Sequence, residues 1–133
     1  MKAVPITQIK KELQHLSQEE LVEIVLRVGK YKLENKELLT YLLFEAGDED
    51  GYIDVVKAYM DEQFELVNQQ HYYYIKKSVR KILRTIKKYV KFSKKAETEA
   101  ALLIHFCRRL KEMEPSYLNN TVLTNMFDRQ LAL

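Results

Sequence analysis

The chain has 133 residues, with 22 lysines and arginines against 19 aspartates and glutamates, for a net charge of +3. We expect one domain, residues 1–133, because this length can bury a single core. The longest apolar run, 100–104, is too short to span a membrane, and the first 13 residues lack a stretch of signal-peptide length. Three glycines and two prolines are too few for a strand-and-turn protein, so the composition favours an all-α fold.

Cysteine usage bears on the cell compartment. Cys107 is the only cysteine, so no disulfide can form within the chain. A chain without disulfides suits a reducing compartment, and we expect a cytoplasmic protein. On a helix, Cys107 is more simply a small core residue than a nucleophile.

Three helices are predicted in the first third of the chain. The first covers about 8–15, and a Ser-x-x-Glu capping box at Ser17 and Glu20 starts the second, 18–29. The third begins at an Asn35 cap and ends near Gly47. Their apolar residues recur at spacings of three and four, and we expect them in the core. They are Ile9, Leu13, Leu16, Leu21, Ile24, Val25, Val28, Leu38, Leu39, Leu42 and Leu43.

Four more helices are predicted after a break at 47–51. They cover about 52–68, 72–92, 93–113 and 118–131. In the first of these we expect a buried side formed by Val55, Val56, Tyr59, Phe64 and Val67. The whole chain is then all-α, with six or seven helices paired as successive antiparallel hairpins. These hairpins form either a short α-superhelix, which we favour, or an irregular bundle.

The segment 72–92 has the most informative pattern. Ten of the twenty residues from Lys76 to Lys95 are basic and none is acidic, which leaves the rest of the chain with 12 basic and 19 acidic residues, a balance of −7. Apolar residues at spacings of four and three, Ile75, Val79, Ile82, Ile86 and Tyr89, predict one buried side. The opposite side carries seven basic residues that we call the basic surface. They are Lys77, Arg80, Lys81, Arg84, Lys87, Lys88 and Lys91.

Three interpretations of the basic surface compete. It is a solvated face partly neutralised by Asp54, Asp61, Glu62 and Glu65 of the preceding helix, or it binds an acidic protein or a second copy of the chain, or it binds nucleic acid. The rings of 72–74 favour nucleic acid, although Tyr72 falls on the apolar side. We predict an acidic protein partner, with nucleic acid as the alternative. A membrane surface is not expected, because the apolar side is needed for the core.

Metal and catalytic patterns are weak throughout the chain. Glu12 and His15 form a single Glu-x-x-His, whereas a di-iron bundle needs two with two further glutamates. His105 and Cys107, two positions apart, point in directions about 200° apart on a helix. We therefore expect no metal, no cofactor and no enzymatic activity. An enzyme built from carboxylates that meet only in the folded chain is the remaining alternative.

The acidic segment 47–51 also fails as a calcium loop. With Gly51 at the sixth position of such a loop, Ala46 and Lys57 take the first and twelfth positions, where carboxylates are required. We therefore interpret 47–51 as a solvated turn.

Five short segments resemble one family. Residues 10–13 (KKEL), 16–17 (LS) and 19–23 (EELVE), together with 79–82 (VRKI) and 86–89 (IKKY), are similar to a family of small all-helical bacterial proteins of unknown function. The likeness covers a quarter to a third of the chain, through motifs of low specificity. It implies an all-helical cytoplasmic bacterial protein and transfers no functional residues.

Overall fold

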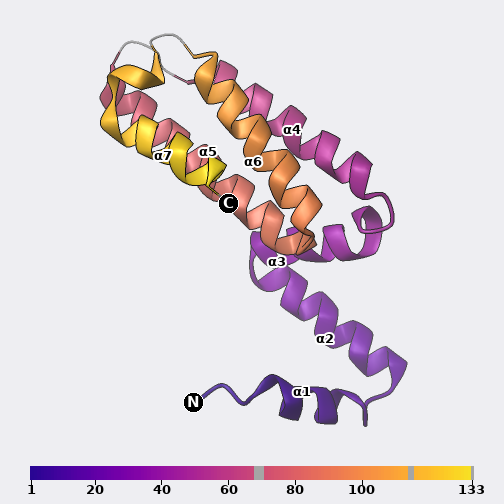
Figure 1. Ribbon diagram of the computed structural model, residues 1–133. Coiled ribbons are helices and arrows are strands. Elements are labelled where there is room, and N and C mark those ends of the chain that lie inside the picture. Colours follow the sequence, from indigo (N-terminus) through magenta and orange to yellow (C-terminus); the bar gives the residue numbers. More distant parts are fainter. Residues whose placement is uncertain (68–70, 114–115, 133) are drawn as a thin grey trace. The chain divides into compact units, whose positions relative to one another are not determined.

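The computed structural model describes residues 1–67, 71–113 and 116–132 (Figure 1). Within these residues it contains seven α-helices and no strand, which confirms the all-α prediction. The chain divides into two compact units, Met1–Thr40 and Tyr41–Leu133. We describe each unit by itself, and the assignment of 1–133 to a single domain stays a prediction.

The first unit consists of α1 (Ile6–Leu13), α2 (Gln18–Tyr31) and α3 (Leu33–Thr40). The predicted capping box is present at the start of α2. The Glu20 backbone N–H donates to Ser17 Oγ at 3.1 Å, and the Ser17 N–H donates to Glu20 Oε1 at 3.0 Å. These two bonds satisfy amide groups that otherwise lack partners at a helix start. They also lower the pKa of Glu20, mainly through its bond to the Ser17 backbone.

The predicted helix ends near Gly29 and Asn35 are wrong. Gly29 lies inside α2, and a Cβ atom there would lie 2.7 Å from Leu39 Cδ1, so the glycine allows α3 to approach α2 closely. Asn35 lies inside α3, where its side-chain amide donates to the Val28 carbonyl at 2.8 Å. Both residues therefore hold α3 against α2.

The first unit buries almost nothing, so its predicted core is wrong. Gly29 is its only buried residue, whereas Ile24, Val25 and Val28 are 41, 42 and 51% exposed. Of the other residues predicted to be buried in this unit, Ile9 and Leu38 are exposed. The remaining four are half-buried: Leu13, Leu16, Leu21 and Leu39.

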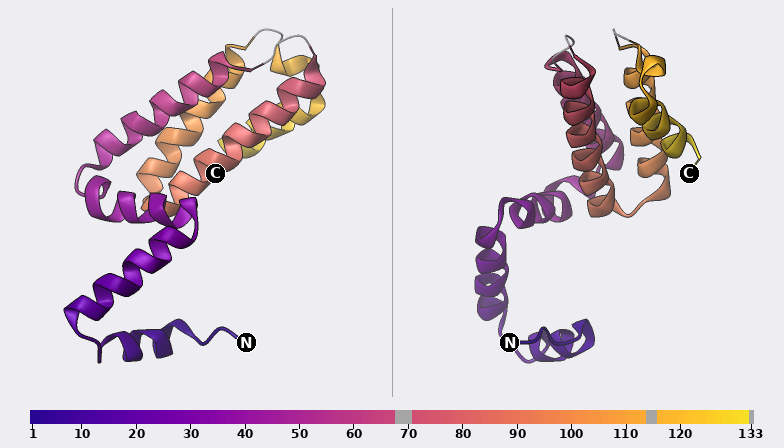
Figure 2. Two further views of the ribbon diagram at one scale, coloured as in Figure 1. Left: turned by 180° about the vertical axis from the view of Figure 1, so that it is seen from behind. Right: turned by 90° about the vertical axis from the view of Figure 1, so that its left-hand side faces the viewer.

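The second unit begins with a π-helical turn, η1 (Tyr41–Glu45), and continues with α4 (Glu49–Glu65), α5 (Tyr72–Ser93) and α6 (Ala96–Lys111). A 3₁₀ turn, η2 (Tyr117–Asn119), precedes α7 (Thr121–Leu131). Helix α6 packs against α4, α5 and α7, and α4 also packs against α5 (Figures 1 and 2). Consecutive helices pair, as predicted, and because α4 also packs against α6, the second unit is a bundle, which is one of the two predicted arrangements and not the favoured α-superhelix.

Only Gly47 and Asp48 of the segment 47–51 lie outside a helix, so the solvated turn is shorter than predicted. Asp48 caps α4, accepting a hydrogen bond from the Gly51 N–H at 3.1 Å, so 49–51 form the first turn of this helix. The helix therefore begins three residues earlier than predicted. The first two residues of that turn are acidic, which suits the positive end of the helix dipole.

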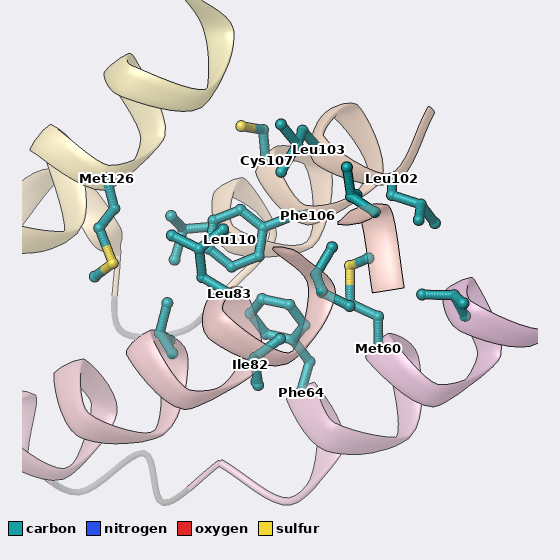
Figure 3. Close-up of a cluster of buried hydrophobic side chains, with 14 of the residues drawn as sticks. Met60, Phe64, Ile82, Leu83, Leu102, Leu103, Phe106, Cys107, Leu110 and Met126 are labelled. Carbon is teal, nitrogen blue, oxygen red and sulfur yellow. The ribbon is translucent and has the colours of Figure 1, made fainter. Parts of the chain in front are cut away.

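Four helices contribute to the core of the second unit (Figure 3). The predicted buried side of α5 is confirmed, with Ile75, Val79, Ile82 and Ile86 at most 3% exposed. Aromatic packing joins α4 to α6, with ring centroids of Phe64 and Phe106 5.8 Å apart. Burying one such side chain contributes about 1.5–3 kcal/mol. Burial was wrongly predicted for one residue of α4, Val55, which is 60% exposed. It was also wrongly predicted for Leu42 and Leu43 of η1, which are 54 and 69% exposed.

Candidate functional site

The basic surface occupies the side of α5 that faces away from the core. Of its seven residues, six are exposed and Lys88 is half-buried. The opposite side of the helix is fully packed, so α5 holds the basic residues on a fixed backbone. Lys94 ends α5 in the left-handed conformation, at φ 60°. The basic surface therefore ends within the helix at Lys91, and Lys94 and Lys95 lie beyond the end of α5.

Among the residues that the structure describes, no carboxylate lies within 4 Å of six of the seven basic groups. These six are Lys77, Arg80, Lys81, Arg84, Lys87 and Lys91. Lys88 lies over the Tyr89 ring, with its Nζ 4.9 Å from the ring centroid. Like charges at i,i+4 in a helix destabilise it by a few tenths of a kcal/mol per pair. An anionic ligand that neutralised this row would remove that repulsion.

Two acidic residues of α4 that were expected to face these lysines face α6 instead. Asp61 Oδ1 lies 2.7 Å from His105 Nε2 and 3.5 Å from Arg109 Nε, and Glu65 Oε1 accepts from Arg109 Nη2 at 2.9 Å. The Arg109 guanidinium also lies over the Phe64 ring, 5.8 Å from its centroid. For Asp61 and Glu65, the predicted neutralisation of the basic surface is therefore wrong.

The three tyrosines at the start of α5 separate into two groups. The hydroxyl of Tyr72 donates to the Ser116 carbonyl at 2.9 Å and its ring packs against the core, as its position on the apolar side predicts. Tyr73 and Tyr74 are 64 and 49% exposed, with ring centroids 5.2 Å apart. At 100° per residue, Tyr73 falls within the angular range of the basic surface and Tyr74 lies about 20° beyond its edge, both about one turn before Lys77. The exposed side of α5 thus begins with two rings and continues with cations.

A second polar cluster lies around Glu49, in the first turn of α4. Its Oε1 accepts from the Thr98 hydroxyl at 2.6 Å and from the Ser93 hydroxyl, and its Oε2 accepts from the Tyr41 hydroxyl at 2.9 Å. Lys95 Nζ lies 3.7 Å from Oε2. Burial raises the pKa of Glu49, but these hydrogen bonds and the lysine charge outweigh it and hold the pKa below its usual value. The carboxylate, which belongs to α4, joins η1, the last residue of α5 and the first turn of α6.

The sequence offers three residues for metal or nucleophilic chemistry: Glu12, His15 and Cys107. Glu12 is exposed in α1 and His15 lies beyond its end. Cys107 is buried, with its Sγ 3.7 Å from the Phe127 carbonyl oxygen, and burial raises the pKa of its thiol. No group of three or more metal-ligating side chains occurs among the described residues.

A hollow of about 470 Å³ lies beside α6 and α7. Its lining is mostly apolar, with Glu99 and Gln130 as the polar exceptions, so it contains no acid–base pair. Within the described residues, no helix is long and apolar enough to cross a bilayer.

Two clusters were missed by sequence reasoning, for different reasons. Asp61 and Glu65 are four residues apart on α4, and so are His105 and Arg109 on α6. This matched spacing places each pair on one face of its helix, and it was a usable signal for the ion pairs. The donors around Glu49 come from three segments with no shared spacing. Nothing in the sequence marks that cluster.

The comparisons with known proteins give no relative. The chain matches no family model, no curated protein and no solved structure. The resemblance to a bacterial family therefore stays a prediction, and the function must be argued from the residues alone.

Proposed function

We propose that this protein is a non-enzymatic helical interaction module whose basic surface on α5 binds an acidic surface of a protein partner. One observation supports this most directly. Six cations project from a single helix without a carboxylate partner among the described residues, although the chain has 19 acidic residues. Cations without a carboxylate partner among the described residues can attract an anion from outside the chain.

The geometry suits an extended anionic partner. Lys91 lies fourteen positions after Lys77, a rise of about 21 Å along the helix axis at about 1.5 Å per residue. Along this row each cation has another three or four residues away, which is also the spacing of acidic side chains along one face of an α-helix. Because the core fixes the backbone of α5, only the long side chains must be ordered on binding.

Contacts of the kind that we propose for the partner occur between two helices of this chain. Arg109 of α6 lies between Asp61 and Glu65 of α4, at 3.5 and 2.9 Å. Two helices in this protein are thus already joined by basic and acidic side chains at four-residue spacing. An acidic helix laid along α5 would repeat this pattern over four turns.

Nucleic acid is the second candidate, and the exposed rings of Tyr73 and Tyr74 favour it. An unpaired base can stack on an exposed aromatic ring, which is worth about 1–3 kcal/mol per base, while neighbouring cations neutralise phosphates. The two rings continue the row of cations toward the start of α5. A single strand following this side of the helix would meet both features.

The two candidates are separated by titrating the full chain with two probes, poly-glutamate and oligothymidylate, at low salt. We expect poly-glutamate to bind more tightly. Replacing Lys77, Arg80, Lys81, Arg84 and Lys91 with glutamine should abolish that binding. The matched control replaces five exposed lysines of the first unit with glutamine, for the same change in net charge, and should retain it. These are Lys2, Lys10, Lys11, Lys32 and Lys36.

The outcomes are distinct. Tight binding of oligothymidylate alone, with a log–log salt slope of about −0.7 per phosphate, would replace the protein partner by nucleic acid. In that case Tyr73→Leu and Tyr74→Leu should weaken binding of the oligonucleotide. Equal loss of binding in the control variant, or no binding of either probe, would contradict a role for this surface.

A further inference from the structure

Helix α4 carries the largest excess of acidic residues of the described helices, with six carboxylates against one lysine. Four of the six are exposed and form what we call the α4 row: Asp50, Asp54, Glu62 and Glu65. Among the described residues, no cation lies within 4 Å of Asp50, Asp54 or Glu62. Glu65 contacts Arg109, yet its side chain remains 76% exposed. The row is therefore open to solvent along its length.

The α4 row and the basic surface of α5 match in length and width. Glu65 lies fifteen positions after Asp50, a rise of about 22 Å, compared with about 21 Å from Lys77 to Lys91. At 100° per residue, each set of side chains spans about 120° of its helix circumference. The lysine of α4, Lys57, falls outside the arc of the α4 row, and α5 has no acidic residue. The two surfaces are thus complementary in charge, length and width.

Within one chain these two surfaces turn away from each other. Tyr59 and Tyr89 mark where α4 meets α5, with ring centroids 5.9 Å apart. By helical position, the centre of the α4 row lies about 120° from Tyr59 around α4. The centre of the basic surface lies about 140° from Tyr89 around α5. The bundle therefore holds two complementary surfaces in different directions, although α4 and α5 are neighbours.

We propose that the acidic partner of the basic surface is the α4 row of a second copy of this chain. The proposal rests on the proposed function, because it names the partner of that same surface. A copy that docks its basic surface on a second copy keeps its own α4 row open, so the contact is head-to-tail and can add further copies. The first unit is a weaker partner, because residues 1–40 contain seven basic and six acidic residues.

The first test is the mass of the full chain by sedimentation equilibrium at low salt. Exposed ion pairs are individually weak, so we expect the average mass to rise above the 15.9 kDa of one chain at about 100 µM. Adding about 1 M salt shortens the screening length to about 3 Å and should return the mass to that of one chain. A constant 15.9 kDa up to about 1 mM at low salt would overturn the proposal.

Two variants that each lack one surface identify the pair. One is the five-glutamine variant of α5, and the other, the α4-row variant, is Asp50→Asn/Asp54→Asn/Glu62→Gln. Each alone should remain a monomer. An equal mixture of the two should form a one-to-one dimer that grows no further, because one complementary pair of surfaces remains. A monomeric mixture, with both variants still unfolding cooperatively on heating, would refute the pairing.

The matched control removes three exposed carboxylates of the first unit, for the same change in net charge: Glu12→Gln, Glu19→Gln and Glu23→Gln. This control should associate as the wild type does. Equal loss of association in the control would show that overall charge, and not the α4 row, drives association, and the proposal would fail.

Carbodiimide cross-linking tests whether the contact lies between chains. This reagent joins a carboxylate directly to a lysine amine. In an equal mixture of isotope-labelled and unlabelled protein, we expect cross-links between the α4 row and Lys77, Lys81 or Lys91 that contain both isotopic forms. Cross-links of these lysines within one isotopic form only, to the α4 row or to the first unit, would mean that the chain covers its own basic surface. That result would exclude a second copy as the partner.

Failure of this pairing and failure of the proposed function give different results. The α4-row variant keeps the basic surface and should bind poly-glutamate as the wild type does. Poly-glutamate should also dissociate the wild-type assemblies, because it competes for the basic surface. A monomeric wild type that binds poly-glutamate would overturn self-association alone. A monomeric wild type that does not bind it would overturn both proposals.

Discussion

Helices α2 and α5 show the same apolar periodicity and opposite burial. In α5, Ile75, Val79 and Ile86 are 0% exposed, whereas Ile24 and Val28 of α2 are 41 and 51% exposed. Both helices have a polar side opposite the apolar one. The difference lies in their neighbours, because α4 and α6 cover the apolar side of α5. Periodicity therefore identifies which side of a helix seeks a partner, but it does not tell whether the same unit supplies one.

The largest effect should separate these two helices with one kind of substitution. Ile82→Asp should prevent folding of the bundle, because an unpaired buried carboxylate costs several kcal/mol against a total stability of about 5–15 kcal/mol. Ile24→Asp should leave the thermal midpoint of the bundle unchanged, since Ile24 is 41% exposed in the other unit. Lys81→Asp, on the exposed side of α5, should also be tolerated within about 1 kcal/mol. Calorimetry of the three variants measures this, and equal midpoints would refute the burial assigned to α5.

A smaller loss is expected at Glu49, which joins segments that only the second unit brings together. Glu49→Gln turns an amide N–H₂ toward hydroxyls that now donate to the carboxylate, and should cost about 1–3 kcal/mol. Chemical denaturation at neutral pH measures this loss. Asp50→Gln, at an exposed residue one position further along the same turn, is the matched control and should cost far less. An unchanged free energy of unfolding in Glu49→Gln would show that the carboxylate does not stabilise the contact between these segments.

Acid should reproduce the Glu49 effect in the wild type. The pKa of Glu49 is lower in the folded chain than its usual value of about 4.3. The stability that it contributes is therefore present above that value, and it disappears as the pH falls through the lowered folded pKa. The Glu49→Gln variant should lose less stability than the wild type over that interval. Parallel pH profiles for the two proteins would contradict the lowered pKa.

How much the sequence could predict differs between the units for a physical reason. The periodicity of α5 predicted its helix to within one residue at its end, because the pattern was strong and the chain supplies α4 and α6 to cover it. For α2 the same kind of pattern predicted the helix but not its burial, because burial requires a neighbour that spacing does not reveal. The helix start at Glu49 was missed because Gly47 and Gly51 suggested a turn, whereas the Asp48 side chain caps a helix that already contains Gly51.

The site was predictable where it depends on one helix, and not where helices meet. The exposure of Lys77, Arg80 and Lys81 follows from the apolar side of the same helix. Whether Asp61 and Glu65 contact α5 or α6 depends on the rotation of α4 about its own axis in the bundle. The local sequence of α4 does not predict that rotation. The sequence therefore predicted that Asp61 and Glu65 pair with α5, whereas they pair with α6.

A local substitution should show that α2 depends on its cap more than α5 does. Ser17→Ala removes the Oγ that accepts from the Glu20 N–H and should cost about 1 kcal/mol of helix stability. Amide exchange in α2 should then accelerate about 5-fold. The start of α5 has no side-chain cap at His71, so His71→Ala is the matched control and should leave exchange in α5 unchanged. Unaltered exchange in α2 would indicate that contacts other than the capping box determine its stability.

The smallest expected change in stability concerns the exposed side of α5. Whether stability rises or falls is the test. Replacing Lys77, Arg80, Lys81, Arg84 and Lys91 with glutamine removes like-charge pairs at i,i+3 and i,i+4, each worth about 0.2–0.5 kcal/mol. Because no carboxylate among the described residues pairs with these five groups, their removal should raise the stability of the bundle by about 1 kcal/mol. The gain should shrink with added salt, which already screens the repulsion. Five glutamines at Lys2, Lys10, Lys11, Lys32 and Lys36 should leave the bundle's midpoint unchanged, since these residues lie in the other unit. A loss of stability in the α5 variant would mean that acidic side chains cover the basic surface, and the surface would then be part of the fold and not a place for a partner.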